Sequence, residues 1–109
     1  MPVYNKLVRD LIPQVIESRG KEFRTRILDE EEYTKELVVK LKEESEEYFA
    51  AQSSKESLEE LADMLEVIRA LVVVHGATWE ELEILREKKV EARGGFQERV
   101  FLIDVHDNA

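Results

Sequence analysis

The stretch KEESEEYFAAQSSKESLEELADMLEVI, residues 42–68, decides the fold. It contains two acidic clusters, KEESEEY and EELAD, separated by a short polar link. In each cluster two carboxylates lie three residues apart, as Glu44 with Glu47 and Glu60 with Asp63. A helix places residues at this spacing on one face, where like charges repel each other. A cation or a basic partner is therefore expected between them.

Capping signals predict a helix on each side of the link. Asp29 with Glu32, and Ser53 with Glu56, have the spacing of a capping box, and apolar residues at helical spacing follow each of them. The first of these helices should reach about Ala51 and the second should end near Gly76. Because only a few residues join the two helices, they should pack as an antiparallel hairpin.

The hairpin should bring the two acidic clusters together. Glu47 lies about six residues before the turn and Glu60 about six after it, so a rise of ~1.5 Å per residue puts them at similar heights. Glu44 and Asp63 should form a second level one turn further on. This matching predicts one shared acidic site.

The rest of the chain also favours helices. Asp10 is placed to cap a helix over about residues 11–19, and Thr78 with Glu81 starts another that should end at Gly94 and Gly95. The tail after Gly95 should be extended or irregular. We expect a single all-α domain over residues 1–109, built as a helical bundle around the hairpin.

Apolar residues on several sides of one helix indicate that the chain assembles with copies of itself. The residues concerned lie around the helix that follows Ser53, and a helix that is apolar on several faces is buried on several sides. An oligomer that covers these apolar faces is therefore expected. The residues that carry this prediction are Val67, Val72, Val73 and Val74.

Composition excludes several classes of protein. A net charge of −9 argues against nucleic acid or an anionic membrane as partner. The chain has no cysteine and two histidines, so thiolate chemistry and imidazole-rich metal sites are improbable. The longest apolar run, Leu71 to Val74, is far shorter than a membrane span. We expect a soluble cytoplasmic protein with no membrane partner.

Carboxylate oxygens in a helical frame suit magnesium or manganese. Such a site can bind the phosphates of a nucleotide while a further carboxylate takes a proton from an attacking water, which indicates metal-assisted hydrolysis of a phosphoanhydride. The alternative is a pair of solvated acidic faces with basic partners at helical spacing. Asp63 favours a site, because it lies close to the apolar stripe, where an unpaired charge is costly.

These residues resemble the MazG-type all-α nucleoside triphosphate pyrophosphohydrolases, relatives of phosphoribosyl-ATP pyrophosphohydrolase. The family signature is an ExxE followed by an ExxD on the next helix, which here falls on Glu44, Glu47, Glu60 and Asp63. YNKLVRDLIP at residues 4–13 and EKKVEARGGFQERVFL at residues 87–102 are similar to a subgroup of house-cleaning enzymes. The resemblance thus covers nearly the whole chain.

The resemblance implies hydrolysis of a nucleoside triphosphate, of a modified or surplus kind, to a monophosphate and pyrophosphate. It implies Mg²⁺, or Mn²⁺ in its place, held by the four signature acids, and a MazG-like bundle completed by oligomerisation. The catalytic base would be one of Glu43, Glu44 and Glu47.

Basic and polar residues near both ends of the chain are candidates for substrate binding. Taken alone, these residues are typical of an exposed basic terminus and of a helix end whose dipole they stabilise. The resemblance to the MazG-type family makes contact with phosphate the expectation. These candidates are Asn5, Lys6, Arg9, Lys89 and Arg93.

Two other functions fit the same residues. One is hydrolysis of phosphoribosyl-ATP. The other is a non-catalytic acidic helical module that binds a metal, a nucleotide or a partner protein.

Overall fold

The computed structural model describes residues 2–107, which form four helices and no strand. The prediction of an all-α chain is confirmed. In order, the helices are α1 (Ile12–Ser18), α2 (Glu30–Ala50), α3 (Ser54–Val74) and α4 (Trp79–Arg93).

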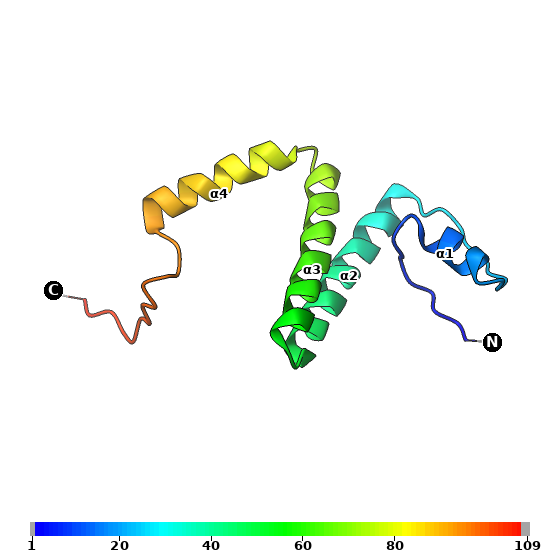
Figure 1. Ribbon diagram of the computed structural model, residues 1–109. Coiled ribbons are helices and arrows are strands. Elements are labelled where there is room, and N and C mark those ends of the chain that lie inside the picture. Colours follow the sequence, from blue (N-terminus) through cyan, green and yellow to red (C-terminus); the bar gives the residue numbers. More distant parts are fainter. Residues whose placement is uncertain (1, 108–109) are drawn as a thin grey trace.

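The central feature is the pairing of α2 with α3. Only residues 51–53 separate the two helices, which therefore run antiparallel and side by side over most of their length (Figure 1). The helix bounds agree with the sequence prediction to within one or two residues. This pairing brings the two acidic clusters to one face of the hairpin.

Side-chain caps fix where the three longer helices begin. The N-cap residue of each accepts a hydrogen bond from the backbone N–H three residues later, which satisfies one of the otherwise unpaired donors of the first turn. The N-caps are Asp29 for α2, Ser53 for α3 and Thr78 for α4, and their donors are Glu32, Glu56 and Glu81. All three caps agree with the sequence prediction.

The predicted cap of the first helix is wrong. Leu11, not Asp10, is the N-cap residue of α1, and no side chain caps this helix. The reason is a tight turn immediately before it, in which the N–H of Ile12 donates to the backbone carbonyl of Arg9 at 3.0 Å. The backbone itself satisfies the donor that a cap would have used.

The apolar core of the single chain is small. Among the described residues only Leu37, Val67 and Val72 are buried apolar side chains. The radius of gyration is 19.1 Å, whereas a compact chain of this length would have about 13 Å. Val73, on the same helix as two of the buried residues, is 71% exposed. Large apolar surfaces of the chain thus face solvent.

Helix α4 leaves the end of α3 and points away from the hairpin (Figure 1). Gly76, with a φ of +75°, makes the turn between them. The guanidinium of Arg69 lies 4.7 Å from the ring centre of Trp79, across this turn. Trp79 thus connects the start of α4 with the side chain of an α3 residue. The tail beyond Gly95 contains no helix or strand in its described part.

No helix among residues 2–107 has the length and apolar character needed to cross a membrane.

We expect the replacement Ser53→Ala to lower the free energy of unfolding by about 1 kcal/mol, because it removes the side-chain cap of α3. Ser54→Ala is the matched control, since Ser54 is the first residue of α3 and does not cap it. Urea denaturation at one fixed protein concentration measures both. Equal losses in the two variants would show that the Ser53 cap does not stabilise α3.

Candidate metal centre

Three carboxylates converge where α2 and α3 face each other. One oxygen each of Glu44, Glu47 and Glu60 lies within 4.8 Å of the other two. Glu44 and Glu47 are one turn apart on α2, and Glu60 comes from α3. The predicted matching of Glu47 with Glu60 across the hairpin is confirmed, and this cluster could hold a metal ion.

Glu44 is the most unusual member, because it is the only charged or polar residue in the described chain that is buried. Its residue surface is 7% exposed. One oxygen, Oε1, lies 3.7 Å from the Nζ of Lys40. The other, Oε2, is buried without a hydrogen-bond partner, and so is Oε2 of Glu60. Two buried acceptors without a donor are costly.

A divalent cation fits this environment. Oxygen ligands around an octahedral Mg²⁺ at ~2.1 Å lie roughly 3 to 4.2 Å apart, and the three carboxylate oxygens are already within 4.8 Å of each other. The donors are oxygen only, which suits hard cations such as Mg²⁺, Mn²⁺ or Ca²⁺ rather than zinc. The cation would also supply the missing partner of the two buried oxygens.

Burial and mutual repulsion also change the protonation of the three carboxylates. Burial is the main cause that raises the pKa of Glu60 to about 7, and the neighbouring carboxylates of Glu47 and Glu44 raise it further. Burial also raises the pKa of Glu44, and the negative charge of Glu47 adds to the effect. Glu44 and Glu60 therefore hold protons more tightly than ordinary carboxyl groups when no cation is present.

Lys40 is a residue of the site that the sequence prediction missed. Its Nζ lies 3.6 Å from Glu43 and 3.7 Å from Glu44. It precedes these residues by three and four positions on α2, and that spacing is itself a signal for ion pairs. This spacing can be read from the sequence, but the prediction considered only the repulsion between the acidic residues.

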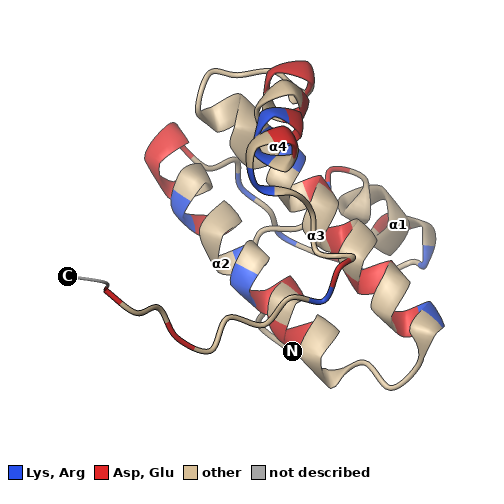
Figure 2. Ribbon diagram, turned by 90° about the vertical axis from the view of Figure 1, so that its left-hand side faces the viewer, with Lys and Arg blue, Asp and Glu red and all other residues tan. Residues whose placement is uncertain are grey.

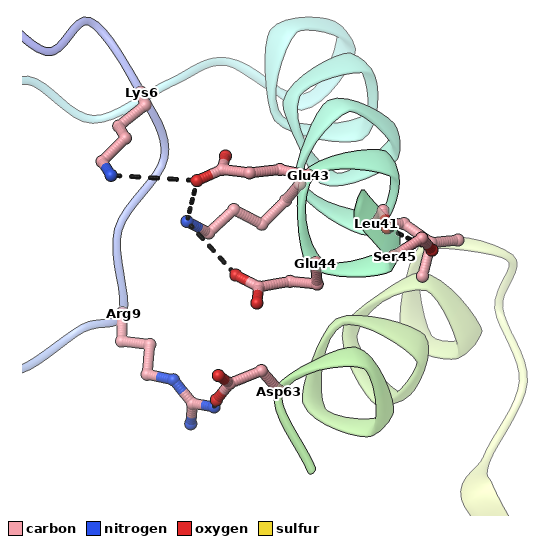
Figure 3. Close-up of polar contacts among 8 residues, drawn as sticks. Lys6, Arg9, Leu41, Glu43, Glu44, Ser45 and Asp63 are labelled. Atoms are coloured by element: carbon pink, nitrogen blue, oxygen red, sulfur yellow. Dashed lines mark hydrogen bonds and ion pairs between the residues drawn. The ribbon is translucent and has the colours of Figure 1, made fainter. Parts of the chain in front are cut away.

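Glu43 lies beside the cluster rather than in it. Besides Lys40 it contacts Lys6, whose Nζ is 3.8 Å from its Oε1. In Figure 3 Lys6 reaches Glu43 from the chain segment before α1, and Glu44 lies between this pair and Asp63. Glu43, one of the three candidate bases, is therefore paired with two lysines.

Asp63, the fourth predicted ligand, lies outside the group of three converging oxygens. Its Oδ1 accepts a hydrogen bond from Nη2 of Arg9 at 2.6 Å (Figure 3). It is still a neighbour of the cluster, because its charge helps to raise the pKa of Glu44. Arg9, predicted as a ligand of phosphate, is thus placed at the edge of the acidic site.

The segment before α1, residues 2–11, delivers two of the predicted substrate-binding residues to the site. Lys6 contacts Glu43 there, and Arg9 contacts Asp63. Asn5 is exposed and has a positive φ of 44°, a backbone conformation that is uncommon for residues other than glycine. No contact of Asn5 with the cluster is seen.

Lys89 and Arg93 do not reach the cluster of their own chain. Both are exposed on α4, which points away from the hairpin (Figure 1). At the end of that helix the N–H of Gly94 donates to the carbonyl of Val90 at 2.7 Å, with a φ of +81° at Gly94. Gly94 thus ends the helix, as the sequence predicts.

Charge around the centre is unbalanced. Acidic residues form bands along α2 and α3, with few basic residues among them (Figure 2). Five carboxylates, those of Glu43, Glu44, Glu47, Glu60 and Asp63, lie near three cationic groups, those of Lys6, Arg9 and Lys40. The two remaining negative charges match one divalent cation.

Comparison of the chain with family models, with curated proteins and with solved structures gives no match. The resemblance to MazG-type enzymes therefore rests on the motifs of the chain itself.

The metal-free protein should become less stable as the pH rises from about 4.5 to about 7. Unfolded chains lose the Glu60 proton near the usual glutamate pKa of 4.5, whereas the folded chain keeps it until about 7. The folded state therefore binds more protons in this window, and stability falls with rising pH. Glu60→Gln should raise the melting temperature more at pH 8 than at pH 5, measured in EDTA.

Glu59→Gln is the control, because Glu59 is the adjacent exposed acid outside the cluster. If both variants shift the melting temperature equally at every pH, Glu60 does not carry the raised pKa.

Proposed function

We propose that the chain is a divalent-metal-dependent hydrolase of nucleoside triphosphates that releases pyrophosphate. The observation that carries this proposal is the pair of buried oxygens without partners, Oε2 of Glu44 and Oε2 of Glu60. A solvated acidic face would not bury its carboxylates. This burial supports a site for a small cation, and the motif resemblance suggests the reaction.

The metal ligands in this proposal are Glu44, Glu47, Glu60 and Asp63, with Mg²⁺ as the cation and Mn²⁺ as its substitute. The three converging oxygens support the first three. Asp63 is supported by its position beside Glu44. A cation held there would supply positive charge to the phosphates and polarise the bond between phosphorus and oxygen.

The chain's own residues then carry the proton and hold the substrate. One of Glu43, Glu44 and Glu47 takes a proton from the attacking water, whose oxygen forms a bond to the α-phosphorus. The bond from this phosphorus to the oxygen bridging to the β-phosphate breaks, and pyrophosphate leaves with that oxygen. Lys6 and Arg9 are close enough to the acids to bind phosphate oxygens at the same site.

The proposal is tested by an assay of pyrophosphate release over a panel of ordinary, deoxy and damaged nucleoside triphosphates. We expect release that requires Mg²⁺ or Mn²⁺. Glu60→Gln and Asp63→Asn should each lower kcat/KM at least about 100-fold, since loss of about 2.7 kcal/mol of transition-state stabilisation has that effect. Orthophosphate, rather than pyrophosphate, as the first product would contradict the proposal.

Glu46→Gln is the matched control for these variants. Glu46 lies between the two α2 ligands in sequence, but it is exposed and outside the converging group. Its replacement should leave activity unchanged. Metal binding without turnover of any nucleotide would instead favour the non-catalytic module.

The enzyme in this proposal is a homodimer or homotetramer. The extended single chain, with a radius of gyration of 19.1 Å, leaves most of its large apolar side chains exposed. A second copy would cover them, because solvent-exposed apolar area of this extent is unfavourable. Because α4 points away from the hairpin of its own chain, Lys89 and Arg93 would bind substrate in this assembly at the metal centre of a neighbouring copy.

Light scattering after gel filtration should give a mass of at least twice the 12.7 kDa of one chain. Val73→Asp should lower that mass, because Val73 is an exposed apolar residue on α3 that a second copy would cover. Val3→Asp is the control, because it introduces the same charge at an exposed position outside the helices, and it should leave the mass of the assembly unchanged. A wild-type mass of one chain would refute the oligomer.

A further inference from the structure

The Arg9–Asp63 ion pair joins two parts of the chain that are 54 residues apart in sequence. Nη2 of Arg9 donates to Oδ1 of Asp63 at 2.6 Å, and the two side chains are 57% and 39% exposed. No other hydrogen bond of the Arg9 side chain is made with residues 2–107. A guanidinium has five N–H donors, so most of them remain available to a ligand.

The pair is poorly suited to a purely stabilising role. Ion pairs at this exposure contribute little to stability, because solvent screens them. Leu7 and Val8, next to Arg9, are half-buried, and in the same segment the Nζ of Lys6 lies 3.8 Å from Oε1 of Glu43. The Arg9–Asp63 pair is thus one of two ion pairs between residues 2–11 and the helical hairpin, and its own contribution to stability is small.

The position of Asp63 also makes it a possible further ligand of the metal. The three converging oxygens of Glu44, Glu47 and Glu60 do not complete the six positions around an Mg²⁺ ion. Asp63 is the next carboxylate along α3, one turn beyond Glu60, and its charge acts on Glu44. The carboxylate that would extend the ligand set is thus the one that Arg9 holds.

Arginine also suits the molecule that arrives with the cation. Its planar fork binds phosphate oxygens through two parallel hydrogen bonds, as it binds carboxylates. Both kinds of partner compete for the same guanidinium. Figure 3 shows Arg9 extending from the segment before α1 to Asp63, beside Glu44. A phosphate bound to a cation at the acidic site would lie close to this guanidinium.

We infer that Arg9 is an exchangeable counter-ion of the metal centre. It holds Asp63 while no cation is bound, and it passes to a phosphate of the substrate when the cation takes Asp63. This inference rests on the proposed metal centre. It makes Arg9 a residue that opposes binding of the free metal and favours binding of the metal–triphosphate complex.

Two titrations by calorimetry test the exchange, one with Mn²⁺ alone and one with the preformed complex of Mn²⁺ and inorganic tripolyphosphate. Arg9→Gln should bind Mn²⁺ about two- to fivefold more tightly, the range expected from the loss of one exposed ion pair. The same variant should bind the tripolyphosphate complex about tenfold more weakly, because a charged hydrogen bond to phosphate is lost.

Two controls separate the exchange from a general effect of charge. Lys35→Gln removes one positive charge from an exposed position of α2 and should leave both affinities unchanged. In an Asp63→Asn background Arg9 has no carboxylate to hold, so Arg9→Gln should no longer tighten Mn²⁺ binding. Arg9→Lys should restore the wild-type affinity for Mn²⁺ but only part of that for the tripolyphosphate complex.

Each other outcome overturns a stated part of the account. Weaker Mn²⁺ binding by Arg9→Gln would make Arg9 a residue that orients Asp63 for the metal, and unchanged binding would leave it no role there. An equal gain in the Asp63→Asn background would show that Arg9 acts through its charge alone. If the wild-type chain binds no Mn²⁺, the proposed metal centre itself is wrong.

Discussion

Packing of α2 against α3 forces carboxylates into a place where they repel each other and lose water. Leu37 and Val67 are buried on the two helices, and the link of three residues leaves little freedom to shift one helix along the other. The capped starts of both helices fix the register further. Apolar packing and local caps thus impose an electrostatic conflict at the site.

The basic residues neutralise the acidic cluster only at its edge. Lys40, Lys6 and Arg9 approach the acids from the edge, and each contacts one or two of them. Their long side chains do not reach the two buried oxygens that lack a partner. A small cation would offer those oxygens the partner that they lack, and the three converging carboxylates could hold one.

Sequence reasoning worked where the cause was local. The caps at Asp29, Ser53 and Thr78 depend on residues three positions away, and the level of Glu47 with Glu60 depends only on helix rise and a short link. It failed at the start of α1, where a backbone turn replaced the expected cap. The contact of Arg9 with Asp63 spans 54 residues, and no periodicity or spacing encodes an encounter at that distance. The residue types suggested binding of phosphate, but not the carboxylate that Arg9 contacts.

The most direct test of the central claim is a crystal structure of the protein grown with Mn²⁺, with anomalous diffraction recorded to locate the metal. The account predicts an anomalous peak between the helices, coordinated by oxygens of Glu44, Glu47 and Glu60. Crystals in which Mn²⁺ occupies only other positions, with these three carboxylates holding no metal, would contradict it.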